Sequence, residues 1–342
     1  MKMRLSPGLI NILFGSIFLL LIFISCTRED ASPSLAGVYM VGYERVNAIS
    51  VAKYWKDGTE FSLTDGSRHA FAKSVFVTDQ DVFVCGEEFN SAGIRVAKYW
   101  KNGQPVELGI NSYAESIFVD GNDVYVAGAE YANPNIIRAI YWKNGIVNYL
   151  TTVSTQAEAW SVSVAAGNVY VAGWEKVNIP FVPRYWKNGT GFTLGGGPIS
   201  TGSLKSVAIA GTDVYMAGNE NTATVFSQAA YWKNGTKTVL GPSNSESQVN
   251  SISISGGDVY AAGYEQTGGM NFAVYWKNGV MTRLTDGSEA ATAMDIESKN
   301  GDVYIAGSKG GAIQNAVYWK NGTLVPLTNG ANNSYCLGIF IK

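Results

Sequence analysis

Residues 123–145 read DVYVAGAEYANPNIIRAIYWKNG, and close variants of this stretch recur through the chain. Its final part, Tyr-Trp-Lys followed by Asn or Asp and then Gly, occurs seven times at intervals of 42 to 46 residues. A repeat of that length is typical of solenoids, propellers and arrays. The copies begin at Tyr54, Tyr99, Tyr141, Tyr185, Tyr231, Tyr275 and Tyr318.

Each repeat contains four short runs rich in Val, Ile, Tyr and Trp, separated by Gly, Asn, Asp and Ser, which predicts four β-strands joined by turns. We name them strand A (SVxV, as at 116–119), strand B (VYVAG, 124–128), strand C (ending in YWK, 139–143) and strand D (ending in Leu150). Asn-Gly after strand C suits a two-residue hairpin turn. Each repeat is therefore predicted to be a four-stranded antiparallel meander, like a β-propeller blade.

The strand types at the two ends of the repeat region predict a closed ring. The first recognisable strand, Val38–Val41, is of type B, and the last, Gly338–Ile341, is of type A. The last strand can complete the blade formed by strands B, C and D near residues 38–64, which leaves no unpaired innermost strand. The sequence thus predicts an all-β, seven-bladed propeller over residues 35–342.

Over about residues 34–342 the chain resembles β-propeller repeat proteins, and its GDVYVAG-type stretches are similar to the glycine-punctuated repeats of bacterial propeller proteins. The Gly after strand B and the aromatics of strand C make it loosely similar to kelch repeats. It departs from them because the double glycine is missing and Tyr and Trp are adjacent. This resemblance implies a fold and no particular activity.

Charge and composition argue against one class of partner. Charged residues make up 15% of the chain and the formal net charge is −2. A nucleic-acid partner would need a clustered basic surface, so none is expected. The Lys of each YWKNG is interpreted as a solvated charge beside a turn.

The N-terminus carries a targeting pattern. Lys2 and Arg4 precede an apolar stretch from Leu9 to Ile24, which Cys26 follows closely. A basic and then an apolar segment is typical of a secretory signal, and this one is shorter than the roughly 20 residues of a spanning helix. An uncleaved signal anchor is the alternative.

The small residue before Cys26 resembles the processing site of bacterial lipoproteins. That resemblance implies a signal peptide of residues 1–25, a lipidated Cys26 with a short linker to residue 34, and anchoring to a membrane through the lipid. The residues behind Cys26 are similar to those of lipoproteins sorted to the Gram-negative outer membrane, some of which are surface-exposed.

No catalytic constellation emerges from the sequence. His69 is the only histidine and has no Cys or His at ligand spacing, so we expect no metal and no cofactor. Cys85 and Cys336 stand where other repeats have Ala, which favours small core residues over a disulfide.

A glutamate stands two residues after the Gly of strand B in six of the seven repeats. If the B–C and D–A loops share one face, as is usual in propellers, these carboxylates could form an acidic ring there. The interpretation that we favour is that each accepts backbone N–H bonds in its own loop or pairs with the next blade. The six are Glu44, Glu88, Glu130, Glu175, Glu220 and Glu265, with Lys309 in the seventh repeat.

Two positions on this B–C/D–A face vary between repeats and are candidates for ligand binding, because a ligand is rarely seven-fold symmetric. Trp160 and Trp174 fall in the same repeat. Aromatics beside Asn and acids suit carbohydrate stacking or a protein hot spot, and packing within the loops is an equally open interpretation. The candidates are Lys73, Glu115, Trp160, Lys205 and Asn250 just before strand A, and Tyr43, Trp174 and Tyr264 just after the Gly of strand B.

Three functions remain open on these residues. The first is a non-enzymatic, lipid-anchored binding module for a glycan or a protein on the B–C/D–A face. The second is an extracytoplasmic lyase or glycosidase that uses two carboxylates at the channel mouth, such as Glu115 and Glu158. The third is a structural or assembly scaffold, which a uniformly polar face without a pocket would favour.

Overall fold

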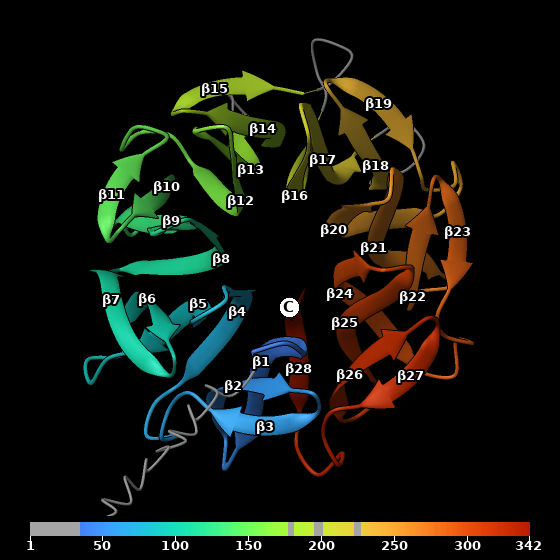
Figure 1. Ribbon diagram of the computed structural model, residues 1–342, viewed down its shortest axis with the longest axis horizontal. Helices are drawn as coiled ribbons and strands as arrows, with labels where there is room; N and C mark the ends of the chain where they lie inside the picture. The colour runs from blue at the N-terminus through green and yellow to red at the C-terminus, as the bar shows by residue number, and fades with distance from the viewer. Residues whose placement is uncertain (1–34, 177–180, 195–200, 222–226) are drawn as a thin grey trace, which may run out of the picture. The chain divides into compact units, whose positions relative to one another are not determined.

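Seven four-stranded antiparallel sheets surround a central axis in the computed structural model (Figure 1). The structure describes residues 35–176, 181–194, 201–221 and 227–342, so the predictions for residues 1–34, including Cys26, lie outside it. Within the described ranges every regular element is a strand, and no helix there could span a membrane. The predicted all-β, seven-bladed fold is confirmed.

The four strand types occupy equivalent places in every blade, from innermost A to outermost D. Strands of type A are β28 (Ser334–Ile341), β4 (Ala70–Val77), β8 (Ser112–Asp120), β12 (Ala157–Ala165), β16 (Gly202–Ala210), β20 (Glu246–Ser255) and β24 (Ala290–Lys299). Strands of type B are β1 (Val38–Val46), β5 (Val82–Phe89), β9 (Asp123–Asn133), β13 (Asn168–Lys176), β17 (Asp213–Glu220), β21 (Asp258–Thr267) and β25 (Asp302–Gly310). Strands of type C are β2 (Ile49–Lys56), β6 (Arg95–Lys101), β10 (Ile136–Lys143), β14 (Phe181–Lys187), β18 (Gln228–Lys233), β22 (Met270–Lys277) and β26 (Gln314–Lys320). Strands of type D are β3 (Thr59–Ser62), β7 (Gln104–Ile110), β11 (Ile146–Tyr149), β15 (Thr190–Thr193), β19 (Thr236–Val239), β23 (Val280–Arg283) and β27 (Thr323–Pro326).

The ring closes as the strand types predict. Blade 1 has the order β28-β1-β2-β3, so the last strand of the chain is the innermost strand of the first blade. Val38 of β1 pairs with Ile341 of β28, and the ladder runs on to Glu44 opposite Ser334. Blades 2 to 7 follow in chain order, each from strand A to strand D.

The recurrence of YWKNG has a local cause at the C–D turn. In blade 3, Asn144 adopts a φ of 52°, which its side chain tolerates better than a larger one would. Its Oδ1 accepts the Val124 N–H at 2.8 Å and its Nδ2 donates to Asp123 at 2.7 Å. Lys143 completes the contact with an ion pair to Asp123 at 2.8 Å. This Lys is solvated beside the turn, as expected, with 44% of its side chain exposed, and the Asp before strand B also pairs with it.

The tryptophans of strand C fill the contacts between blades. All seven are fully buried, with exposed fractions of 0 to 2%. Trp186 of blade 4, for example, packs against Tyr125 and Ala127 of blade 3. Cys85 and Cys336 are buried free thiols in two different core clusters, in the positions that Ala takes elsewhere.

The glycine of strand B lies inside its strand, where the sequence pattern had suggested an end. β13 continues three residues past Gly173, and the register opposite it skips Trp160. A Cβ at Gly173 would lie 1.9 Å from the Glu158 carbonyl oxygen, so the bulge in strand A requires glycine there. Every blade has this bulge, and the skipped residues are Lys73, Glu115, Trp160, Lys205, Asn250, Met294 and Leu337.

Hydrogen bonds link neighbouring blades directly behind the bulges. In four blades the serine after the bulge accepts a backbone N–H of the next blade, as Ser161 does from Val207 at 3.1 Å. Asp295 replaces the serine in blade 7. Its Oδ1 accepts the Ser251 hydroxyl of blade 6 at 2.6 Å, and its Oδ2 accepts the Ile339 N–H of blade 1 at 2.8 Å. Asp295 thus links three consecutive blades at the ring closure.

Candidate functional site

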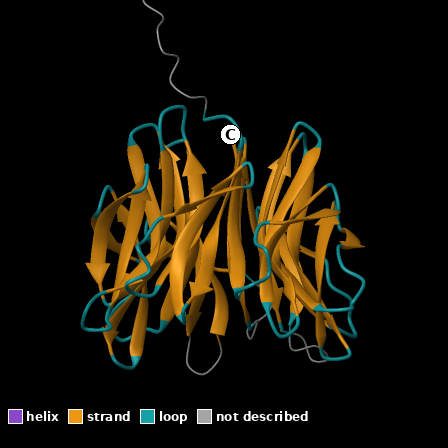
Figure 2. Cartoon of the chain, turned by 90° about the horizontal axis from the view of Figure 1, so that it is seen from below, coloured by secondary structure: helices purple, strands orange, loops and turns teal. Residues whose placement is uncertain are grey.

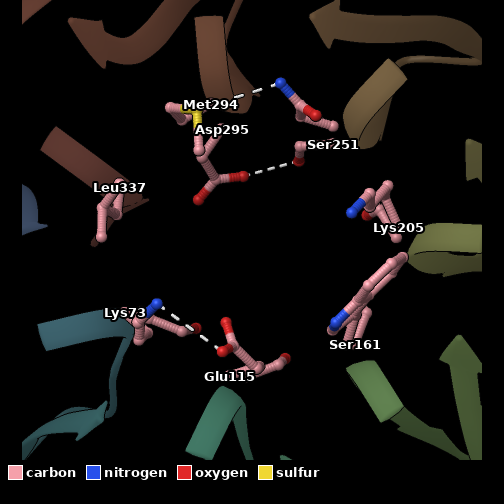
Figure 3. A pocket seen from close by; sticks show the side chains of 13 residues that line it. Lys73, Glu115, Ser161, Lys205, Ser251, Met294, Asp295 and Leu337 are labelled. Atoms are coloured by element: carbon pink, nitrogen blue, oxygen red, sulfur yellow. Dashed lines mark hydrogen bonds and ion pairs between the residues drawn. The ribbon is translucent and has the colours of Figure 1, made fainter. Parts of the chain in front are cut away.

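The seven bulge residues meet around the central axis and form the mouth of the channel. Each lies about three residues into its inner strand, close to the D–A loops, so the mouth opens on the B–C/D–A face. Figure 3 shows Lys73, Glu115, Lys205, Met294 and Leu337 arranged around the opening. The cavity that they line has a volume of about 230 Å³. Five candidates from the sequence therefore line one cavity, namely Lys73, Glu115, Trp160, Lys205 and Asn250.

The inner strands carry an apolar cluster in blades 1 to 3 and two carboxyl groups in blade 7. Phe76 packs against both Phe118 and Phe340, with ring centroids 5.0 and 4.8 Å apart. Burial raises the pKa of Asp295 to about 6, against the hydrogen bonds that it accepts. Burial, and then the neighbouring Asp295, raise the pKa of Glu297 to about 8.

Charges at the mouth are arranged in pairs on one side. The Lys73 ammonium lies 3.6 Å from the Glu115 carboxylate, which raises the pKa of Lys73. Beside them is Glu87, whose side chain is 5% exposed and lies 3.6 Å from Arg95. Burial raises the pKa of Glu87, although Lys73 and Arg95 oppose that effect.

Blades 4 and 5 present a different arrangement. The Lys205 ammonium lies 3.2 Å from the centroid of the Trp160 ring, a cation–π contact. The indole N–H of Trp160 donates to Glu158 at 2.6 Å, and Glu158 also shares a hydrogen bond with the Tyr113 hydroxyl. Burial lowers the pKa of Lys205 to about 8, while Glu158 and Glu115 favour its charged form and Lys73 opposes it.

A second cavity, which we call the groove, adjoins the mouth and shares Trp160 with it. It has a volume of about 530 Å³ and lies between blades 4 and 5. Trp174 contacts Trp160 edge-on at 6.3 Å and Phe181 at 4.6 Å between ring centroids. The Ser203 hydroxyl donates to Oδ1 of Asn219 at 2.8 Å on the opposite wall. The groove is lined by Trp160, Trp174, Phe181, Thr201, Gly202, Ser203, Asn219 and Asn221.

Two of the candidate aromatics line neither of these cavities. Tyr43 packs between Phe71 and Tyr335, with centroid distances of 4.8 and 4.9 Å. The Tyr264 hydroxyl donates to Gln248 at 3.4 Å. Both therefore pack against strand A of their own blade near the rim.

The six glutamates that stand two residues after the glycine of strand B are each paired with a cation of their own blade. Glu130 and Arg138 are directly opposite in the β9–β10 ladder, and their side chains meet at 3.1 Å. Glu44 and Lys53 are diagonal neighbours on one face of β1 and β2. Paired cross-strand neighbours of this kind replace the loop and next-blade partners that we had favoured. Glu88–Lys98 and Glu175–Arg184 are further pairs between strands B and C, whereas Glu220–Lys237 and Glu265–Arg283 join strand B to strand D of the same blade.

Metal-binding chemistry has no evident centre in the described part of the chain, where no group of three His, Cys, Asp or Glu side chains converges. His69 accepts the Ser50 N–H through Nδ1 at 3.2 Å, which ties it to strand β2 of blade 1.

Several residues of the site escaped the sequence analysis. Phe181 and Asn221 flank loops that differ between repeats, so length and composition of the B–C loops were the available signal. Asp295 and Glu297 carried a clearer signal in a strand that reads SVxV elsewhere, because Asp295 replaces a Ser and Glu297 stands where the other repeats have Phe, Ser or Ala.

Comparisons with known proteins support the fold. No family model matches the chain, and no curated protein matches it. Among solved structures, a puromycin hydrolase has a TM-score of 0.58 and 10% identity, covering 87% of this chain and 54% of that one. A Mycobacterium tuberculosis puromycin-hydrolysing peptidase gives 0.56 and 12%, covering 85% and 52%. The chain thus spans about half the length of each.

The β-propeller domain of the Trilobed protease from Pyrococcus furiosus has a TM-score of 0.52 and 11% identity, covering 86% of this chain and 93% of that one. At such identities the likeness concerns the propeller alone.

Proposed function

We propose that this chain is a non-enzymatic binding module that holds a carbohydrate in the groove between blades 4 and 5. The observation that carries the proposal is the groove itself, with aromatic faces on one wall and hydroxyl and amide groups on the other. Sugar rings stack their apolar C–H faces on aromatics while their hydroxyls need hydrogen-bond partners. Trp174 and Phe181 supply the first requirement, and Ser203 with Asn219 the second.

The carboxylates of the mouth fit an enzyme less well than a binding site. A glycosidase needs one carboxyl that can act as an acid and a second that is free to attack or to activate water. Glu115 is paired with Lys73, and Glu158 is hydrogen-bonded to Trp160 and Tyr113. Both oxygens of Asp295 accept hydrogen bonds that join blades. A scaffold role is disfavoured because the face carries two cavities.

The lipid anchor is part of the proposal and rests on the sequence around Cys26. The place where the described chain begins suits a displayed site. The described chain begins beside the C–D turn of blade 1, where the Val38 N–H donates to Asp57 at 2.9 Å. The C-terminus lies at the same end, because the Lys342 N–H donates to the Gly37 carbonyl at 2.9 Å (Figure 2). Attachment to the outer membrane from that end would leave the B–C/D–A face directed away from the attachment.

The test is binding of the full-length chain, purified in detergent, to a panel of polysaccharides by calorimetry. Trp174→Ala removes the main stacking surface, and Tyr264→Phe is the control because it alters the rim outside both cavities. We expect saturable binding without product release, lost in Trp174→Ala and kept in the control. Release of shorter products would identify an enzyme instead. Binding of no saccharide would contradict the proposal and favour a protein ligand.

A further inference from the structure

Lys205 differs from the other lysine of the mouth in lacking an anionic partner. Lys73 lies 3.6 Å from Glu115. Among the described residues, no carboxylate lies within 4.0 Å of the Lys205 ammonium, which lies over the Trp160 ring instead. A desolvated ammonium without a counter-ion is unfavourable, because burial penalises the charged form. An anion supplied from outside would relieve that penalty.

The carboxylates nearest to Lys205 are already engaged. Glu158 accepts from the Trp160 indole and shares a hydrogen bond with Tyr113, and Glu115 is paired with Lys73. Their charges favour the ammonium form of Lys205 from a distance. These two carboxylates leave the Lys205 ammonium able to form a direct, charge-assisted hydrogen bond to a ligand. Such hydrogen bonds are stronger than those between neutral groups.

Trp160 connects this ammonium to the groove. In the mouth, the Trp160 ring makes a cation–π contact with the Lys205 ammonium. The same side chain forms part of the groove wall beside Trp174. A chain of two or more sugar units in the groove can therefore extend past Trp160 and bring the next unit to Lys205.

From this geometry we infer that the ligand is an acidic saccharide, with a uronate carboxylate paired to Lys205 in the mouth and a sugar ring stacked on Trp174 in the groove. The inference rests on the proposed function and specifies its substrate class. Lys205 then selects for a negatively charged ligand, and the aromatic groove selects for the shape of the sugar ring.

The experiment compares two probes that share one sugar chain and differ only at its carboxyl groups, trigalacturonate and its methyl ester, by calorimetry on the full-length chain in detergent. We expect the acid to bind roughly tenfold or more tightly than the ester, in line with a charge-assisted hydrogen bond. Lys205→Met should remove that preference. Lys187→Met, which deletes the same charge at a C–D turn on the opposite face, should keep it.

The outcomes separate the inference from the proposed function. If the acid and the ester bind equally well, or if Lys205→Met keeps the preference for the acid, the acidic assignment is wrong while carbohydrate binding stands. If neither probe binds and neutral oligosaccharides do, the acidic assignment is again wrong. If no saccharide binds at all, both fail.

Discussion

The Lys205 ammonium lies 3.2 Å from the centroid of the Trp160 ring, at the point where the channel mouth meets the groove. The contact with the ring offsets part of the free-energy cost of removing the ammonium from water, since cation–π contacts are worth about 0.5–2 kcal/mol. It cannot replace a full counter-charge. The site therefore combines an exposed apolar wall with a cation in need of an anion, and this combination has consequences for stability as well as for binding.

Replacing Lys205 by Met should stabilise the unliganded protein. Burial lowers the pKa of Lys205 to about 8 from 10.5, so the folded state holds this proton less tightly than the unfolded state. The resulting cost is fully present below pH 8 and disappears as the pH rises through 8 towards 10.5. We expect Lys205→Met to raise the free energy of unfolding by on the order of 1–3 kcal/mol at pH 7.

Chemical denaturation at pH 7 and pH 10 checks this, with Lys187→Met as the control that removes a surface charge. The gain from Lys205→Met should be smaller at pH 10. A variant less stable than the wild type at pH 7 would show that the ammonium stabilises the fold.

Binding of trigalacturonate should weaken as the pH rises above 8. The ammonium of Lys205 is needed for the ion pair with the uronate carboxylate. The groups around it supply no second free cation at this point of the mouth; they are Lys73, Glu115, Glu158, Trp160 and Asn250. Calorimetry between pH 6.5 and pH 9.5 should show falling affinity for the acid and constant affinity for its methyl ester. A pH-independent ratio of the two affinities would speak against Lys205 as the partner.

Glu297→Gln should stabilise the protein at alkaline pH and have little effect at acidic pH. Burial and Asp295 raise the pKa of Glu297 to about 8 from 4.5, so the folded state binds this proton more tightly than the unfolded state does. Stability is therefore lost as the pH rises from 4.5 to 8. We expect a gain on the order of 1–3 kcal/mol at pH 9 and little change at pH 4.5. Thermal unfolding of Glu297→Gln and of the exposed control Glu107→Gln tests this, and an equal effect at both pH values would refute it.

Gly173→Ala should be strongly destabilising. The new Cβ would lie 1.9 Å from the Glu158 carbonyl oxygen, and a backbone atom cannot yield without loss of the bulge. We expect a cost of about 3 kcal/mol or more, since overpacking against backbone is among the most damaging changes. Gly311→Ala is the control because a Cβ there meets nothing within 4 Å. Similar melting temperatures for the two variants would mean that the bulge tolerates a side chain.

The blade architecture was accessible from the sequence because it depends on features that repeat. The spacing of YWKNG and the strand types at the two ends are enough to specify seven blades and their closure. The bulge was not accessible, because a glycine inside VYVAG has the same appearance whether it ends a strand or faces an extra residue in its partner. Only the register of β12 against β13, which skips Trp160, distinguishes the two.

The candidate site was accessible in part. Positions that differ between blades identified Lys73, Glu115, Trp160, Lys205 and Asn250, and the structure brings these five together at the mouth. It places Tyr43 and Tyr264 in packed contacts instead, because a side chain on strand B can pack against strand A of its own blade. The sequence also did not reveal which carboxylates are paired with a cation. That pairing depends on which side chains face each other across strands, as Glu44 and Lys53 do.

The chain's own tryptophans offer the most direct test of the central claim that the groove holds a carbohydrate. Seven of the nine tryptophans are 0–2% exposed, so acrylamide can quench chiefly Trp160 and Trp174. Quenching should be measured on the full-length chain with and without saturating trigalacturonate. The account predicts that the sugar protects the quenchable fraction of the fluorescence, and that Trp174→Ala loses much of that fraction. Saturable binding with unchanged quenching would place the ligand elsewhere and contradict the account.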